Sequence, residues 1–345
     1  MWGNPFGDLH DAIAIDLGTA NILAYRQGRG VVLNEPSVVA IADEEGTHKI
    51  LAVGQEAKRM VGRTPGNIRA IRPMQEGVIA DFQVAALLIE YVIRKVRNGR
   101  HLRGPYIAIS IPSGSTPVER KAIREAAEAA GARKVFLIDE PMAAAIGAGL
   151  PVTEPCGSMV VDIGGGTTET AVLSLGGTVF SQSIRIAGDA IDTAITAYLR
   201  REHRLLIGDE TAERIKLTVG AAHLPDDDEG AAMVIRGRDI AEGVPHEVLI
   251  GEAEIAIAIA EQVTAVVDLV RSSLEVIPPE LAADIMDRGL VLTGGGGLLR
   301  GLDRVLAYSS HLPVVVSDTA LEDVARGAGR ALGDLSLYRF AFEDA

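Results

Sequence analysis

The amino-acid sequence predicts an α/β fold in which two duplicated domains face each other across a cleft. An alternating strand ends near Asp16 and runs into a Gly/Thr turn at 18–19, and the same pattern returns at Asp162 with the turn at 164–168. In both copies, two more strands follow through glycine-containing turns. A chain of 345 residues is long enough for about two domains. One such turn would be typical of any hairpin, but two copies in one chain indicate an internal duplication.

The first copy continues as a meander that gives way to alternating helices and strands. Strands are expected at 12–16, 22–25, 31–33, 38–41, 106–111 and 135–138. Apolar residues recur at helical spacing over 81–96, and Pro117 is suited to the first turn of a helix over 117–130. Shorter helices are expected at 54–61 and 141–148.

The second copy opens with three strands, at 159–163, at 170–173 and through 180–184. Helices are expected at 189–201 and 211–219, and one long helix at 252–277 should stop at the two prolines that follow it. The acidic run 225–230 is interpreted as a solvated surface turn. A strand at 290–293 then enters four consecutive glycines and a further helix.

Composition limits the classes of function. Lys and Arg number 33 against 47 Asp and Glu, so the net charge of −14 argues against nucleic acid as a partner. The single cysteine, Cys156, excludes an internal disulfide framework and fits a reducing cytoplasm. We see no stretch of about 20 apolar residues and no basic and apolar leader, so neither a membrane span nor a signal peptide is expected.

The N-terminal segment carries Trp2 and Phe6 without any pattern of secondary structure. Two aromatic rings on such a tail suit the interfacial region of a membrane. A tail that packs on its own domain is an equally good interpretation.

The repeated turns have the composition of phosphate-binding loops. Glycines let backbone N–H groups approach phosphate oxygens, and the hydroxyls of Thr19 and Thr167 add donors. Asp16 and Asp162 stand just before the turns, and such a carboxylate pair suits Mg²⁺ bound to phosphate oxygens. The glycine run 294–297 could pass under an adenine ring. Neither a P-loop nor a GxGxxG pattern occurs, which argues against P-loop and Rossmann enzymes.

Several motifs together resemble the actin/Hsp70/sugar-kinase ATPase superfamily and, within it, the MreB family of bacterial rod-shape proteins. The superfamily motifs are IDLGTAN at 15–21, DEPMAAA at 139–145, DIGGGTTE at 162–169 and LTGGG at 292–296. The narrower resemblance is carried by LNEPSVVA at 33–40, GRTPGNI at 62–68, IRPM at 71–74, GVIADF at 77–82 and TAERIK at 211–216. The likeness extends over residues 10–333.

The resemblance implies an actin-like fold of two duplicated ribonuclease-H-like domains around a nucleotide cleft. Domain I would span 8–150 with a subdomain at 34–74, and domain II 151–333 with a subdomain at 187–250. The tail 334–345 would pack on domain I.

The resemblance also implies Mg²⁺ and ATP as cofactors and assigns roles to residues. Asp16 and Asp162 would organise the metal, Glu140 would orient the attacking water, and Asp162 and Thr167 would assist catalysis. The phosphates would be bound by Gly18, Thr19, Ala20, Asn21, Gly164, Gly165, Gly166, Thr167, Gly188 and Asp189. The nucleoside would be bound by Glu213, Lys216, Gly294, Gly295, Gly296 and Leu298.

As partners, the resemblance implies other copies of the chain in paired protofilaments, the anionic inner face of the cell membrane, and cell-wall elongation proteins of the MreC, MreD and RodZ type. The expected membrane contacts are Trp2, Phe6 and Leu102. Relatives commonly have more apolar residues in the loop 97–104, where this chain has arginines around Leu102, so insertion of this loop is in question. Relatives also usually have Glu where this chain has Asp139, and Gly where it has Ala187.

Two alternatives remain at this point. A related filament could serve DNA segregation or organelle positioning instead of cell shape. A small-molecule kinase of the same superfamily would need a substrate pocket, for which no insertion is evident.

Overall fold

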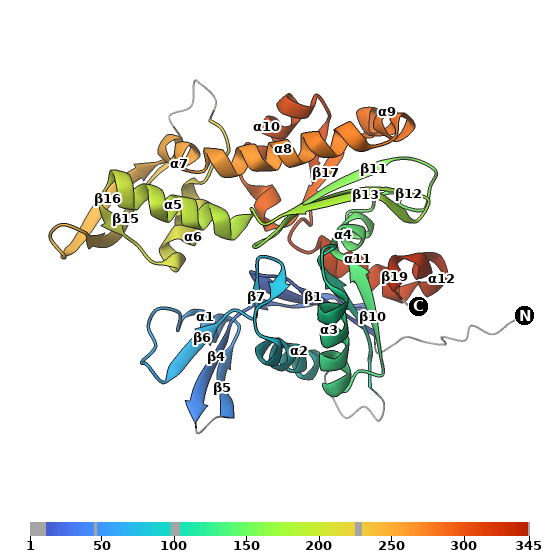
Figure 1. The fold of residues 1–345 in the computed structure, drawn as a ribbon, viewed down its shortest axis with the longest axis horizontal. Coiled ribbons are helices and arrows are strands. Elements are labelled where there is room, and N and C mark those ends of the chain that lie inside the picture. Colours follow the sequence, from blue (N-terminus) through green and yellow to red (C-terminus); the bar gives the residue numbers. More distant parts are fainter. Residues whose placement is uncertain (1–11, 45–46, 98–103, 225–229, 344–345) are drawn as a thin grey trace, which may run out of the picture.

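The computed structural model describes residues 12–44, 47–97, 104–224 and 230–343. Two halves lie one above the other, each with a large sheet and a smaller sheet to one side (Figure 1). We call residues 12–147 together with 323–343 the first half, and residues 158–316 the second half.

The large sheets of the two halves share one topology. In the first half the order is β19-β10-β9-β1-β2-β3, and in the second β13-β12-β11-β17-β18. Strands β1, β2 and β3 form an antiparallel meander with β9 parallel to β1, and β11, β12 and β13 form the same meander with β17 parallel to β11. This matching order confirms the predicted α/β duplication.

The bounds of these strands follow the apolar runs of the sequence. In the first half they are β1 (Ala12–Leu17), β2 (Asn21–Arg26), β3 (Gly30–Pro36), β9 (Tyr106–Ile111), β10 (Lys134–Asp139) and β19 (Phe342–Glu343). In the second half they are β11 (Ser158–Ile163), β12 (Thr168–Ser174), β13 (Gly177–Ile184), β17 (Leu290–Thr293) and β18 (Val314–Val316). Strand β19 near the chain end pairs with β10.

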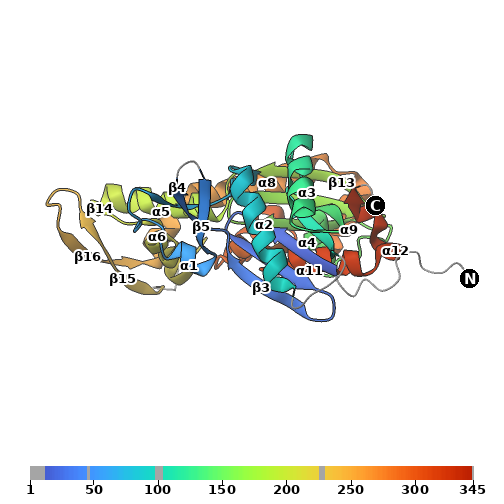
Figure 2. The same ribbon diagram turned by 90° about the horizontal axis from the view of Figure 1, so that it is seen from below.

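Helices cover both faces of the first sheet. The outer face carries α2 (Phe82–Val96) and α3 (Pro117–Ala129), which stand in front of the sheet in Figure 2. Both are well capped, α2 by Asp81 and α3 by a Thr116–Glu119 capping box. Between the two sheets lie α4 (Glu140–Gly147) and α11 (Asp323–Gly333), with α12 (Leu335–Tyr338) and η2 (Arg339–Ala341) following. Small side chains let α4 and α11 approach closely, since a Cβ at Gly327 would overlap the backbone of Ala143.

The second half is covered on its outer side by α8 (Ala260–Val276), α9 (Pro279–Arg288) and α10 (Leu302–Ser310), with η1 (Gly295–Leu298) before α10. The predicted single helix over 252–277 is wrong, because α7 (Glu252–Ala258) and α8 are separate. Ile259 between them leaves helical geometry at φ −105° and ψ 7°. The break lies where packing changes. Helix α7 contacts β16 (Pro245–Gly251), α5 (Gly188–Glu202) and α6 (Asp209–Val219), whereas α8 contacts β12, β13 and α10.

The smaller sheets flank the opening between the halves. In the first half these elements are β4 (Val39–Glu44), β5 (Thr47–Val53), β6 (Ile68–Ile71) and α1 (Gln55–Lys58), followed by the hairpin β7 (Met74–Gln75) and β8 (Val78–Ile79). In the second half they are β14 (Leu205–Leu206), β15 (Ala232–Asp239) and β16 (Pro245–Gly251), with α5 (Gly188–Glu202) and α6 (Asp209–Val219). In Figure 1, α5 and α6 face α1 and β6 across this opening.

Candidate functional site

Asp16 and Asp162 occupy equivalent places on the duplicated strands β1 and β11. Asp16 lies opposite Ser110 of β9, whose Oγ donates a hydrogen bond of 3.0 Å to Asp16 Oδ1. Burial raises the pKa of Asp16 to about 6, although the bond from Ser110 opposes this shift. The carboxylate is therefore costly to keep charged unless a cation or further donors accompany it.

Asp162 is more deeply buried, with 6% of its surface exposed. Its Oδ1 is buried and has no hydrogen-bond partner among the described residues. Burial first, and then the charges of Asp16, Glu169 and Asp323, raise its pKa well above the ordinary value. Two such carboxylates suit a divalent cation that also binds phosphate oxygens, and no larger cluster of ligating side chains occurs in the described ranges.

The two predicted phosphate loops, 18–21 and 164–167, lie against each other. Ser37 Oγ donates to the carbonyl of Gly18 at 2.7 Å, and Gly164 N donates to the carbonyl of Thr167 at 2.9 Å. A Cβ at Gly165 would lie 2.7 Å from the Cβ of Ala20. Glycine is thus required where the backbones of the two halves meet, as expected for a phosphate cradle.

The N-terminus of α5 continues this cradle. Gly188 N and Asp189 N donate to the carbonyls of Gly164 and Gly165 at 3.2 and 2.8 Å. The Asp189 side chain accepts a hydrogen bond of 3.0 Å from Arg72 of the first half. Gly188 and Asp189 therefore lie beside the loop 164–167, while the carboxylate of Asp189 binds Arg72 across the opening. That they bind phosphate stays a prediction.

The β7–β8 hairpin touches both loops, which the sequence reasoning did not foresee. Gly77 N donates a hydrogen bond of 3.4 Å to Thr19 Oγ1. A Cβ at Gly77 would lie 2.5 Å from Thr167 Cγ2. A Cβ at Gly166 would lie 2.9 Å from the backbone of Glu76. Glu76 and Gly77 have φ of 49° and 74°, the geometry of a tight hairpin turn. The sequence signal for this turn is Gly77 itself, which follows two polar residues and precedes Val78 and Ile79.

Glu140 begins helix α4 directly after β10 and is 9% exposed. Burial raises its pKa well above the ordinary value, and the carboxylates of Glu169, Asp16, Asp162 and Asp139 add to this in that order. The structure thus gathers Glu140, Asp16 and Asp162 in one acidic region. Glu169, which belongs to a quoted motif but received no role from the sequence, joins them.

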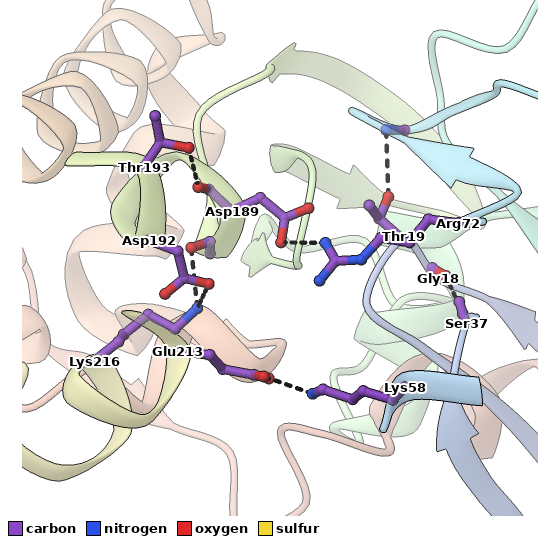
Figure 3. Close-up of polar contacts among 12 residues, drawn as sticks. Gly18, Thr19, Ser37, Lys58, Arg72, Asp189, Asp192, Thr193, Glu213 and Lys216 are labelled. Carbon is purple, nitrogen blue, oxygen red and sulfur yellow. Dashed lines mark hydrogen bonds and ion pairs between the residues drawn. The ribbon is translucent and has the colours of Figure 1, made fainter. Parts of the chain in front are cut away.

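Glu213 and Lys216 share a face of α6 but bind different partners (Figure 3). Glu213 pairs with Lys58 of α1 at 2.5 Å. Lys216 Nζ donates to the carbonyl of Gly188 at 3.0 Å and to Asp192 Oδ2 at 2.8 Å. Asp192, missed by the sequence reasoning, has a pKa raised to about 6 by burial despite the opposing charge of Lys216.

The glycine run packs against the end of β11. Gly294 has φ 77°, and a Cβ there would lie 2.5 Å from Asp162 Oδ1. A Cβ at Gly296 would overlap Ile163. The run therefore adjoins Asp162, with Gly295 beside Leu321 and with Leu298 half-exposed.

Cavities of about 560 and 780 Å³ adjoin α5, a size suitable for a small ligand. The smaller one includes Gly166 and Asp189, and the larger includes Asp189 and Arg72, but neither is lined by Asp16, Glu140 or Lys216. The predicted nucleotide position therefore depends on the loops and carboxylates and not on these cavities.

The membrane contacts predicted at Trp2, Phe6 and Leu102 lie outside the described residues. Among the helices that are described, none has the length and apolar character needed to cross a membrane.

Known proteins resemble this chain in both sequence and structure. The family model described as MreB/Mbl protein matches residues 10–339. The chain is 54% identical over 335 residues to the cell shape-determining protein MreB of Escherichia coli, covering 96% of each protein. It is 49% identical over 323 residues to the cell shape-determining protein Mbl of Bacillus subtilis, covering 94% of this chain and 96% of Mbl.

Solved structures of actin-like proteins resemble the fold of this chain. The crystal structure of MreB5 of Spiroplasma citri bound to AMPPNP has a TM-score of 0.88 at 38% identity, covering 94% of this chain and 96% of MreB5. A double-helical filament of MamK has a TM-score of 0.78 at 21% identity, covering 93% of this chain and 99% of MamK, a likeness of fold alone. The predicted actin-like fold is confirmed by these likenesses.

Proposed function

The chain belongs to the MreB/Mbl family, and we propose that it is an ATP-hydrolysing member that assembles into filaments on the inner face of the cell membrane. It is an actin-like, rod-shape cytoskeletal protein, as its cell shape-determining relatives indicate. The observation that carries the proposed ATP chemistry is the meeting of the two duplicated glycine loops, each preceded by a buried aspartate.

Nucleotide binding is supported by MreB5, which was solved with AMPPNP and with ADP. In this chain the loops 18–21 and 164–167 would bind the β- and γ-phosphates, with Gly188 and Asp189 at the side. Lys216 and Glu213 would hold the ribose, and Gly294, Gly295, Gly296 and Leu298 would line the base. Glu213 can bind the ribose only after its ion pair with Lys58 has broken.

Mg²⁺ fits the same residues. Asp162 Oδ1 is a buried acceptor without a partner in the described chain, and Asp16 lies at the equivalent strand end. When bound, Mg²⁺ would neutralise phosphate charge and hold the phosphates in a fixed orientation.

Hydrolysis would depend on Glu140. Its carboxylate lies at the N-terminus of α4, buried near both aspartates. A raised pKa makes it a better proton acceptor, and a fixed acceptor can orient water for attack on the γ-phosphorus. Thr167 would assist from the facing loop.

Self-association is proposed from membership of the MreB/Mbl family, whose relatives determine cell shape. We propose paired protofilaments, contacts with anionic lipid through Trp2, Phe6 and Leu102, and association with cell-wall elongation proteins of the MreC, MreD and RodZ type. Filaments devoted to DNA segregation or organelle positioning are not favoured, because the cell shape-determining relatives are about half identical over nearly the whole chain.

The test is sedimentation and electron microscopy of the purified protein with Mg-ATP, together with phosphate release. Filaments with phosphate release support the proposal. Phosphate transfer to a small molecule without filaments would instead indicate a kinase, and localisation in cells would separate cell-shape filaments from other filaments.

A further inference from the structure

Glu169 is a buried carboxylate to which the proposed function gives no task. It lies on β12 opposite Asp162 and is 1% exposed. Its Oε1 is buried without a hydrogen-bond partner in the described part of the chain. Burial raises the pKa of Glu169, and hydrogen bonds from Ser113 and then from Ser183 of β13 oppose this shift. Leaving Oε1 unpaired still costs about 1–3 kcal/mol.

The other oxygen of Glu169 is held by the first half of the molecule. Ser113 Oγ donates to Glu169 Oε2 at 3.1 Å, and Ser113 N does so at 3.4 Å. Ser113 follows β9, and its loop is fixed in turn by Arg120, which donates to the carbonyls of Ser113 and Ser115 at 3.4 and 3.1 Å. The orientation of Glu169 therefore depends on contact between the two halves.

The charge of Glu169 also acts on Glu140. Among the carboxylates that raise the pKa of Glu140, Glu169 has the largest effect, ahead of the adjacent Asp139. Both side chains are buried, at 9% and 1% exposed, and the charge of Glu169 adds to the effect of burial on the pKa of Glu140. One comes from each half.

We propose that Glu169 is the second acceptor for the attacking water, completing the hydrolytic site that Glu140 begins. The inference rests on the proposed ATP hydrolysis. A water bound to one acceptor can still rotate about that hydrogen bond. A second acceptor at Oε1 fixes both O–H groups, so that an oxygen lone pair stays directed at the γ-phosphorus.

The step is balanced without any further reactant. The water oxygen bonds to the γ-phosphorus as the bond from phosphorus to the bridging oxygen breaks, and ADP leaves with that electron pair. The proton released by the water passes by way of a carboxylate to solvent. Because Ser113 holds Glu169, water is positioned only when the two halves are in contact.

The decisive variant is Glu169→Gln. The backbone N–H of Ser113 is a donor, so it should keep the amide oxygen of Gln in the place of Oε2. The NH₂ group of Gln, which is a donor, then takes the place of Oε1. Shape is kept while the acceptor is lost. We expect kcat for phosphate release to fall roughly 10- to 100-fold with KM within about twofold. Ser113→Ala should lower kcat about threefold, and the matched control Ser115→Ala should leave it unchanged.

A purely structural role is separated by two further measurements, the melting temperature and assembly with AMPPNP. Assembly should match the wild type in Glu169→Gln, and the melting temperature should not fall, because the amide removes the cost of burying a charge. Wild-type kcat in Glu169→Gln, or a loss of kcat accompanied by equal losses of stability and assembly, overturns the inference alone. Absence of phosphate release from the wild-type protein would overturn the proposed ATPase activity and this inference with it.

Discussion

Lys58 of α1 and Glu213 of α6 form an ion pair of 2.5 Å that joins the two halves at the opening between them (Figure 3). It does not stand alone. Further pairs span the same opening: Arg63 with Glu210, Arg72 with Asp189, and Arg185 with Glu76. All of these side chains are partly exposed, so each pair contributes at most about 1 kcal/mol, and salt screens it. Together these pairs favour a closed state, in which the two halves are in contact across the opening, but they are weak enough to break.

Arg63→Gln, which removes the Arg63–Glu210 pair, should therefore speed nucleotide release. Loss of about 0.5–1 kcal/mol from the closed state corresponds to a roughly two- to fivefold faster release rate. Stopped-flow displacement of a fluorescent ATP analogue measures this rate. Release from the wild type should accelerate with added salt, and the variant should respond less. Lys121→Gln, an exposed site on α3, is the control. Equal release rates for both variants would show that the pair does not restrain the opening.

Asp16→Ala and Asp162→Ala should each abolish assembly that depends on Mg-ATP. The metal would lose a carboxylate ligand, and the phosphates would lose the charge compensation that the metal brings. Sedimentation with and without Mg²⁺ and titration of a fluorescent nucleotide measure the two effects. Wild-type affinity and polymer yield in both variants would contradict the model of two facing loops.

Glu140→Ala should bind ATP and polymerise but release phosphate at least about 100-fold more slowly. Orienting water acts on the transition state and not on ground-state binding, so kcat should fall while KM stays nearly constant. Filaments of this variant should also persist longer in ATP. Phosphate release at the wild-type rate would remove Glu140 from the mechanism.

Much of this site is predictable from sequence because it is local. Asp16 and Asp162 precede their glycine turns directly, so a strand, a carboxylate and a phosphate loop can be placed together from a few residues. The duplication then implies that the two copies face each other, and the matching strand orders agree with this.

Partners that are distant in sequence were not predictable. Nothing near Glu213 in the chain indicates Lys58, and nothing near Glu169 indicates Ser113, because only the packing of the two halves brings them together. The hairpin at Met74–Ile79 was missed because strands of two residues show no periodicity. The break at Ile259 was missed because 252–277 is helical in pattern throughout, and the change of packing partner is tertiary.

Asp192 should make stability depend on pH. Its pKa is about 6 in the folded chain against 3.8 without the fold, chiefly because of burial. Between these values the folded state binds more protons than the unfolded state, so stability from this group is present below pH 3.8 and is lost as the pH rises through 6. The loss approaches about 3 kcal/mol at most.

Asp192→Asn should accordingly raise the melting temperature relative to the wild type more at pH 7.5 than at pH 5. Scanning calorimetry across this range without nucleotide measures the difference. The exposed Asp268→Asn on α8 is the control. A difference between Asp192→Asn and wild type that is constant with pH would show that the carboxyl does not titrate in this range.

Membrane binding should require both polymerisation and anionic lipid. The net charge of −14 repels an anionic surface, so attraction must come from local features. The candidates are Trp2 and Phe6, whose rings favour the interfacial region, and Leu102 among the arginines of 97–103. Each Arg near the surface adds about 1 kcal/mol, so a single subunit should bind weakly. A filament should bind tightly, because each further contact is effectively intramolecular.

The double variant Trp2→Ala/Phe6→Ala tests this directly. It should assemble normally with Mg-ATP but lose most of its co-flotation with vesicles that contain phosphatidylglycerol. Leu102→Ala should cause a smaller loss, because the neighbouring arginines keep their attraction for the headgroups. Wild-type filaments should float less at high salt, since the arginine contribution is screened while the aromatic contribution is not. Undiminished flotation of the double variant would mean that the N-terminal aromatic residues pack on their own domain and that the basic loop carries the membrane contact.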